Sequence, residues 1–205
     1  NDRNHQEKRN AEIQLVIPTP YIYSGEECKP KASVKVFEDT EEIILNENTD
    51  YTLAYENNIN AGTATVKITG IEDYSGTVQR TFNIGAKTLT AIAVVTENKT
   101  YDGTPTVNVT AVTLDGVCED DTVKVDTDHL TGTLTGANVG DYTQVTLSGL
   151  TLVNNENNNY ILHQSNITVP TDVKIAKANI ADVTSGTPLN IANNLKKEYT
   201  YILSR

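Results

Sequence analysis

Residues 57–70 read NNINAGTATVKITG, and this stretch indicates the fold class of the chain. Its first half is dense in Asn and Gly, which tolerate positive φ and favour hairpin loops. In its second half Ala64, Val66 and Ile68 alternate with polar residues. Because successive side chains of a strand point to opposite faces, the pattern predicts a hairpin loop followed by a half-buried β-strand.

The same pattern continues on both sides of this hairpin. Short alternating segments are bounded by Gly, Asn, Asp and Pro, and turn signals recur roughly every 8 to 12 residues, which is the spacing of β-sandwiches. No stretch carries the apolar stripe of an amphipathic helix, which repeats every three to four residues. We therefore expect the chain of 205 residues to be all-β with little helix.

Two motifs of the form Tyr-x-Gly, Tyr23-Ser24-Gly25 and Tyr101-Asp102-Gly103, each open a β-rich stretch. The glycine can take a positive φ in a turn, and the tyrosine can bury its ring while its hydroxyl reaches a polar partner. The motifs are separated by about the length of a small domain, so we expect two tandem modules. The predicted parts are a flexible leader, two β modules and the truncated start of a further segment: residues 1–10, 11–85, 86–177 and 178–205.

The alternation within the first module predicts which side chains of its last strand face the core. Val78, Phe82 and Ile84 fall on one face and should be buried. Arg80 falls on the same face, so we place it near an edge of the sheet, where its guanidinium can reach water.

In the second module the alternation changes phase. Leu89, Ala91, Ala93 and Val95 should share one inner face of a strand. The pattern then slips at Val112 and Leu114, and such a slip predicts a β-bulge.

Composition and charge exclude several classes of partner. The chain has 16 Lys and Arg against 27 Asp and Glu, a net charge of −11 and a pI near 4.6. Nucleic acids and anionic membrane surfaces both attract cationic proteins, so we expect neither as a partner. No apolar run approaches the roughly 18 residues of a membrane-spanning helix, so we expect no membrane insertion within these residues.

We expect no catalytic residue and no cofactor. A hydrolase needs a nucleophile beside a base, or two carboxylates across a cleft. The chain has no Gly-x-Ser-x-Gly motif and no Gly-rich phosphate loop, and its carboxylates lie mainly on predicted turns. Cys28 and Cys118 lie in different modules, and we expect both to be unpaired thiols. These observations predict a protein that is not an enzyme.

Acidic residues gather at two neighbouring places, Glu119-Asp120-Asp121 and Asp126-Thr127-Asp128-His129. Calcium takes six to eight oxygen ligands, so a weak calcium site could form here. The spacing matches no EF-hand loop, and we interpret both places as solvated acidic surface and expect no metal. His5, His129 and His163 are scattered along the sequence, and we assign them surface roles.

Longer segments resemble repeats of known proteins. One resembles the Ig-like repeats of large bacterial surface proteins, with YSG at 23–25, DYTLAYENN at 50–58, AGTATV at 61–66 and YSG at 74–76. The next is similar to the YDG repeat of such proteins, with KTYDGT at 99–104, GDY at 140–142, NYIL at 159–162 and KIAKA at 174–178. The tail, NNLKKEYTY at 193–201, resembles the start of a segment that follows such repeats.

The resemblance implies two tandem immunoglobulin-like β-sandwich modules, in an extracellular protein or on the bacterial cell surface, with no catalytic residue to carry over. Because some related surface repeats are β-grasp domains, β-grasp-like modules are the alternative fold. No residue pattern identifies a ligand-binding site.

We therefore expect a non-enzymatic fragment of a modular surface protein that acts as a spacer, stalk or adhesion module. It should be a monomer, and its partners would be host or microbial surface glycans or proteins. The alternative is a carbohydrate-binding accessory module of a secreted polysaccharide-acting protein. A flat aromatic face for a sugar could come from Tyr21, Tyr23, Tyr51, Tyr55 and Tyr74. The absence of Trp counts against that alternative.

Overall fold

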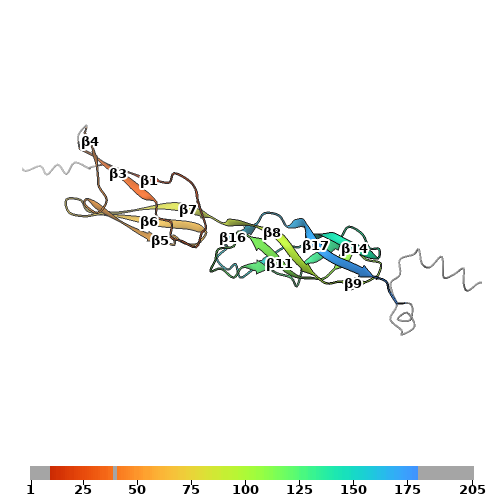
Figure 1. The fold of residues 1–205 in the computed structure, drawn as a ribbon. Coiled ribbons are helices and arrows are strands. Elements are labelled where there is room, and N and C mark those ends of the chain that lie inside the picture. Colours follow the sequence, from red (N-terminus) through yellow and green to blue (C-terminus); the bar gives the residue numbers. More distant parts are fainter. Residues whose placement is uncertain (1–9, 39–40, 180–205) are drawn as a thin grey trace, which may run out of the picture. The chain divides into compact units, whose positions relative to one another are not determined.

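The computed structural model describes residues 10–38 and 41–179 of the chain, and these residues form strands, turns and loops without a helix (Figure 1). The prediction of an all-β chain with little helix is thus confirmed for this part of the sequence. The contacts divide the chain into two compact units. Unit 1 comprises Asn1–Lys87 and Asn157–Tyr160, and unit 2 comprises Thr88–Glu156 and Ile161–Arg205. The choice between an Ig-like sandwich and a β-grasp arrangement stays a prediction, as does the independent folding of residues 11–85 and 86–177.

Unit 1 contains two sheets, with the strand orders β1-β3-β4 and β2-β7-β6-β5. Their strands are β1 (Asn10–Val16), β2 (Tyr21–Ile22), β3 (Lys31–Glu38), β4 (Glu41–Ile44), β5 (Tyr51–Glu56), β6 (Gly62–Gly70) and β7 (Thr77–Gly85). Neighbouring strands are antiparallel, except that β2 runs parallel to β7. The first strand begins at Asn10, the last residue of the predicted leader, and thus one residue before the predicted start of the first module.

The hairpin predicted from residues 57–70 is present between β5 and β6. Asn57 and Gly62 have φ values of 56° and 133°, so the loop uses the conformations that Asn and Gly tolerate. Ala64, Val66 and Ile68 are buried, with exposed fractions of 0%, 0% and 4%. The alternation in β6 therefore places its apolar side chains in the core of unit 1.

The prediction for β7 is correct in its second half and wrong in its first. Phe82 and Ile84 are buried, whereas Val78 is exposed together with Arg80. The short strand β2 pairs only with Ile84 and Gly85, so the first half of β7 is an uncovered edge of the sheet. An edge explains why Arg80 reaches solvent, and it also leaves Val78 in water.

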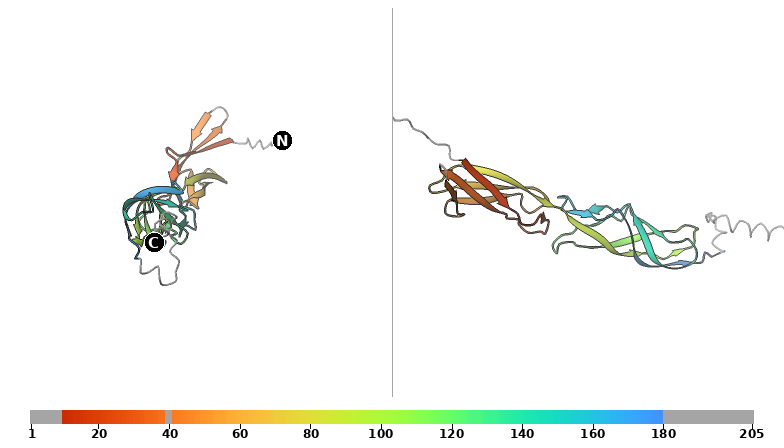
Figure 2. Two further views of the ribbon diagram at one scale, coloured as in Figure 1. Left: turned by 90° about the vertical axis from the view of Figure 1, so that its right-hand side faces the viewer. Right: turned by 90° about the horizontal axis from the view of Figure 1, so that it is seen from above.

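Unit 2 contains three sheets, with the strand orders β10-β13-β14-β17-β9, β11-β8-β16 and β12-β15. Its first five strands in chain order are β8 (Lys87–Thr96), β9 (Lys99–Thr100), β10 (Thr106–Val107), β11 (Val109–Asp115) and β12 (Lys124–Val125). The rest are β13 (Thr131–Leu134), β14 (Gly140–Ser148), β15 (Leu152–Val153), β16 (Tyr160–Leu162) and β17 (Asn166–Ala176). The first residues of β8 and β16, Lys87 and Tyr160, belong to unit 1. Figure 2 shows the strands of each unit from two further directions.

The predicted bulge is present, and it involves both β8 and β11. The register shifts between Val109 and Ala111 and again between Thr113 and Leu114, where the partner on β8 jumps from Ala93 to Ala91. Each skipped residue reverses the alternation of its strand.

This reversal corrects the predicted face of β8. Leu89 and Ala91 are buried as expected, but Val95 is 58% exposed, and Ala93 is exposed as well. Val94 packs against the core of unit 2 in their place. Alternation read along β8 alone could not reveal this change of face, because it arises from pairing with β11.

One apolar cluster forms the core of unit 2, and its most deeply buried members come from the central strands β14 and β17. It consists of Val107, Val109, Val125, Leu134, Val145, Leu147, Leu150, Val169, Val173 and Ile175. Burying one such side chain contributes about 1.5–3 kcal/mol, so the cluster is a major source of stability.

The Tyr-x-Gly motifs at 23–25 and 101–103 each follow a two-residue strand that runs parallel to a longer strand. Tyr21 and Ile22 of β2 pair with Ile84 and Gly85 of β7, and the backbone N–H of Tyr23 donates to the carbonyl oxygen of Gly85 at 2.8 Å.

The corresponding pairing in unit 2 joins β9 to β17. Lys99 and Thr100 pair with Ile175 and Ala176, and the N–H of Tyr101 donates to the carbonyl oxygen of Ala176 at 2.9 Å. Gly25 and Gly103 then take φ values of 82° and 80°. The two motifs thus share register, backbone hydrogen bond and turn conformation.

Among residues 10–38 and 41–179, no helix is long and apolar enough to span a lipid bilayer.

Candidate functional site

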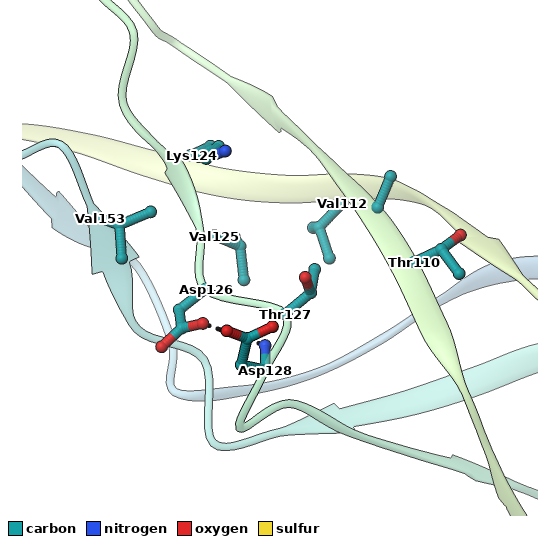
Figure 3. A pocket seen from close by; sticks show the side chains of 9 residues that line it. Thr110, Val112, Lys124, Val125, Asp126, Thr127, Asp128 and Val153 are labelled. Carbon is teal, nitrogen blue, oxygen red and sulfur yellow. Dashed lines mark hydrogen bonds between the residues drawn. The ribbon is translucent and has the colours of Figure 1, made fainter.

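Unit 2 carries a groove of about 480 Å³ beside β11, β12 and β15 (Figure 3). Nine residues line it: Thr110, Ala111, Val112, Lys124, Val125, Asp126, Thr127, Asp128 and Val153. Its volume lies within the range of small-molecule sites, roughly 300–1,000 Å³. The groove is therefore the candidate ligand site of unit 2.

The local sequence explains why the groove combines apolar and polar surface. Thr110 is the residue skipped in the pairing of β11, and its hydroxyl donates to the carbonyl oxygen of Val95 at 3.2 Å. After the bulge, Val112 turns towards the core, and together with Val125 and Val153 it supplies apolar surface (Figure 3). The residues that follow β12 add carboxylates and a hydroxyl, so the groove suits a small ligand that has both polar and apolar parts.

Asp126 is a polar residue of the groove whose backbone and carboxylate are held by hydrogen bonds. Its N–H donates to the carbonyl oxygen of Thr151 at 2.9 Å, and its Oδ1 accepts the N–H of Asp128 at 3.0 Å. Its Oδ2 lies 3.1 Å from Nδ1 of His129. The hydrogen bond with His129, followed by that from Asp128, lowers the pKa of Asp126. Its carboxylate is therefore ionised at neutral pH and already engaged within its own loop, which makes it a poor general base.

The two acidic segments singled out in the sequence do not combine into a metal site. Among the residues that the structure describes, no group of three or more His, Cys, Asp or Glu side chains is arranged to hold a metal ion. His129 is 82% exposed, and His163 is also at the surface. His5 lies outside the described residues. The interpretation of both acidic segments as solvated surface stays a prediction.

The five tyrosines considered for sugar stacking do not form one exposed face. Tyr23 and Tyr51 are buried. The hydroxyls of Tyr51 and Tyr55 donate to the carbonyl oxygens of Ala32 and Pro30 at 2.9 and 2.8 Å.

Two further tyrosines are half-buried. Tyr21 packs against Phe82 with their ring centroids 5.5 Å apart, and Tyr74 lies in the turn before β7. Burial raises the pKa of Tyr21, Tyr51 and Tyr55. These rings connect segments of unit 1, so most of their surface is not available to a ligand.

The two cysteines are not joined in a disulfide, as the sequence predicted. Cys28 is buried, and its N–H donates to the carbonyl oxygen of Asn58 at 2.7 Å, while the side-chain amide of Asn58 donates back to the carbonyl oxygen of Cys28 at 3.2 Å. Burial raises the pKa of the Cys28 thiol, so it is protonated and unreactive at neutral pH.

A polar network surrounds the YDG motif and was not found from the sequence. Nζ of Lys99 lies 2.8 Å from Oδ1 of Asp102 and donates to the carbonyl oxygens of Thr104 and Thr106 at 3.1 and 2.8 Å. Oδ1 of Asp102 also accepts the N–H and the hydroxyl of Thr104 at 2.8 and 2.9 Å. Partial burial opposes ionisation of Asp102, but the hydrogen bonds from Lys99 and Thr104 outweigh it and lower the pKa. The available signal was the KTYDGT sequence itself, where a cation, a carboxylate and a hydroxyl lie within six residues.

Comparisons with known proteins identify one domain in the chain. No curated protein and no solved structure matches the sequence. One family model, described as the YDG domain, matches residues 85–169. This range includes the groove and the Lys99–Asp102 network. Residues 85–169 are therefore a YDG domain.

Proposed function

We propose that residues 11–177 are two tandem Ig-like modules of an extracellular or surface-attached bacterial protein, and that they act as a non-catalytic spacer or adhesion stalk. The observation that carries the proposal is that the same backbone arrangement around a Tyr-x-Gly turn occurs in both units. Tyr23 and Tyr101 each donate to the last residue of a parallel strand, and each is followed two residues later by a glycine with φ near 80°. Unrelated turns have no reason to share all these features, so the recurrence supports a tandem arrangement.

The distribution of polar groups supports a role without catalysis. The core cluster of unit 2 consists of apolar side chains, and the carboxylate of Asp126 in the groove is engaged by its own loop. A protein whose residues mainly fill sheets is suited to hold a shape and to space other parts of a larger protein. The YDG domain at residues 85–169 adds to this argument, because the sequence resembles repeats of bacterial surface proteins.

Surface labelling tests the proposed location. Antibodies against the 205-residue chain should label intact cells that make the parent protein, without permeabilisation, and external protease should remove the signal. Labelling that requires permeabilised cells would contradict the proposal. An antibody against a cytosolic protein of the same cells is the control for leakage.

A carbohydrate-binding role is the second candidate, and the groove of unit 2 is the observation that favours it. Its carboxylate and hydroxyl groups could bind sugar hydroxyls while Val112 and Val153 contact the apolar face of a sugar ring. A glycan array probed with the full chain decides between the roles. Binding that is lost in Asp128→Ala and retained in Asp120→Ala, an exposed acidic residue outside the groove, would favour the sugar site. An array without signal would favour the spacer.

A further inference from the structure

The parallel pairing in each unit joins the strand that precedes the Tyr-x-Gly motif to the last strand of the module. In unit 1 the pair is β2 with β7, and in unit 2 it is β9 with β17. Pairs such as β6 with β7 and β14 with β17 are antiparallel. In unit 2, β8 and β16 also run parallel, because the N–H of Lys87 donates to the carbonyl oxygen of Asn159 and the N–H of His163 to that of Leu89, but neither of these strands is the last of the module. The β2–β7 and β9–β17 pairs are therefore where an early segment of each unit meets the strand through which the module ends.

Parallel neighbours respond to tension in a particular way. When a chain is pulled at its two ends, an early strand is drawn towards its N-terminal side and a late strand towards its C-terminal side. If the two strands are parallel neighbours, they are drawn in opposite directions along a common axis. The hydrogen bonds between them are then sheared together, and no bond can open before the others. Because forced unfolding is governed by the unfolding rate, a barrier at this point raises the mechanical resistance of the unit.

Side chains reinforce both parallel pairs. In unit 1 the ring of Tyr21 on β2 packs against Phe82 on β7. In unit 2 the ammonium of Lys99 on β9 binds three residues of the following loop, Asp102, Thr104 and Thr106, and so keeps this loop closed beside the pair. Neither set of contacts takes part in the groove or contacts any candidate ligand site.

We propose that the β2–β7 and β9–β17 pairs are mechanical clamps that let each module resist tension applied along the chain. The inference rests on the proposed function as a stalk, because a stalk between two surfaces is pulled at its ends. Each clamp consists of the parallel pair and the hydrogen bond from the tyrosine N–H, which extends the pair by one residue.

The structure also contains the geometry for a contrasting direction of pull. In the antiparallel pair of β14 and β17, Gly140 lies opposite Ile175. Asn138, just before β14, is therefore near the same end of this pair as the C-terminal end of β17. Tension between Asn138 and the C terminus would peel β17 from β14 one bond at a time and would not shear the β9–β17 pair.

Single-molecule force spectroscopy on the full chain, held at its two termini, tests the clamp. Tyr101→Ala removes the ring and keeps the N–H, whereas Tyr101→Pro removes both. At equal force, unit 2 of the proline variant should unfold roughly fivefold faster than that of the alanine variant, which is the factor for one net hydrogen bond.

A matched pair of variants controls for general weakening. The N–H of Asp126 donates to the carbonyl oxygen of Thr151 at 2.9 Å, away from both terminal strands of the module. Asp126→Pro compared with Asp126→Ala should lower stability to denaturant by a similar factor, but should leave the unfolding rate under force unchanged. Equal acceleration under force in the Tyr101 and Asp126 pairs would overturn the proposal.

The direction of pull gives a second test that needs no destabilising change in the clamp. With one handle moved from the N terminus to Asn138, the wild-type unit 2 should unfold at a clearly lower force than it does between the termini. Equal forces in the two directions would overturn the clamp. These outcomes do not depend on where the parent protein is located. Surface labelling can therefore contradict the proposed location while the force measurements support the clamp, and the force measurements can contradict the clamp while labelling supports the location.

Discussion

In unit 1 the Tyr23-Ser24-Gly25 turn lies among aromatic rings, whereas in unit 2 the Tyr101-Asp102-Gly103 turn lies beside an ion pair. The ring of Tyr23 meets that of Tyr160 edge-on, with centroids 5.3 Å apart and planes at 81°, and Tyr21 packs on Phe82. In unit 2 the position of Tyr21 is taken by Lys99, which binds Asp102.

The backbone is nevertheless the same in both turns. Each tyrosine N–H donates to the last residue of the parallel strand, and each glycine has a φ near 80°. Ser24, in place of Asp102, accepts only a long contact of 3.4 Å from the N–H of Glu26. The two turns therefore share their backbone conformation, which apolar burial stabilises in unit 1 and local charge stabilises in unit 2.

Removal of the buried ring in unit 1 should have the largest effect. Tyr23 is only 6% exposed, so Tyr23→Ala should destabilise unit 1 by about 3 kcal/mol, as for other large aromatic residues in cores. Tyr101 is half-buried, so Tyr101→Ala should cost unit 2 about half as much. Because the chain has no Trp, amide hydrogen exchange in β6 and β14 is the suitable measurement. Equal losses of unfolding free energy in the two units would show that the tyrosine ring stabilises both turns to the same degree.

A double-mutant cycle between Tyr23 and Tyr160 isolates the ring contact from the burial of each ring. The coupling should be about 0.5–1.5 kcal/mol for an edge-on aromatic pair. A coupling near zero would mean that each ring is held by its other neighbours.

Loss of the ammonium in unit 2 should have the next largest effect. Lys99→Met keeps most of the apolar stem but removes the donor to Asp102, Thr104 and Thr106. The Lys99 side chain is only 15% exposed, so the loss should be about 1–3 kcal/mol for hydrogen bonds to a charged group. The corresponding change in unit 1, Tyr21→Phe, keeps the ring against Phe82 and should cost less than about 0.5 kcal/mol. Amide hydrogen exchange in β6 and β14 reports the stability of both units. A loss of stability in β6 from Tyr21→Phe as large as that in β14 from Lys99→Met would show that the two turns are not held by different interactions.

The glycines should respond alike, because they belong to the shared backbone. An alanine at φ near 80° is strained by about 1–2 kcal/mol, so Gly25→Ala and Gly103→Ala should each weaken their own unit by a similar amount. No atom lies within 4 Å of a Cβ built on Gly25, so its cost is conformational and not steric. Gly25→Asn and Gly103→Asn are the matched controls, since Asn tolerates this conformation better. Melting temperatures that fall in only one unit would show that the two turns are not equivalent.

The sequence was sufficient for features that depend on local pattern. Alternation placed Ala64, Val66 and Ile68 in the core, and Asn and Gly located the hairpin loop before them. The phase slip at Val112 and Leu114 located the bulge, because an extra residue in one strand changes which side chains face inwards.

Features that depend on pairing between distant strands could not be read in this way. Val78 is exposed because its neighbouring strand β2 is only two residues long, and Val95 is exposed because of a register shift against β11. The groove of unit 2 has the same origin. It lies where the bulge in β11 comes beside the loop that follows β12, and these segments are not adjacent in the sequence.

The smallest predicted effect is the dependence of the stability of unit 2 on acidic pH. The hydrogen bonds from Lys99 and Thr104 lower the pKa of Asp102 despite its partial burial. In the unfolded chain this pKa is about 4, so the stabilisation is complete above that value. It is lost as the pH falls through the lower pKa of the folded state, where Asp102 takes up a proton.

Comparison of the wild type with Asp102→Asn over this acidic range isolates the contribution, since Asn does not titrate. The side chain of Asp102 is 49% exposed, so solvent screening should hold the difference below about 1 kcal/mol. The gap in unfolding free energy between the two proteins should therefore narrow as the pH falls below about 4. Ser24→Ala gives the reference for unit 1, where the same position carries no charge and the gap should not depend on pH. A gap for Asp102→Asn that stays constant on acidification would show that Lys99 stabilises the YDG turn through the carbonyl oxygens of Thr104 and Thr106 alone.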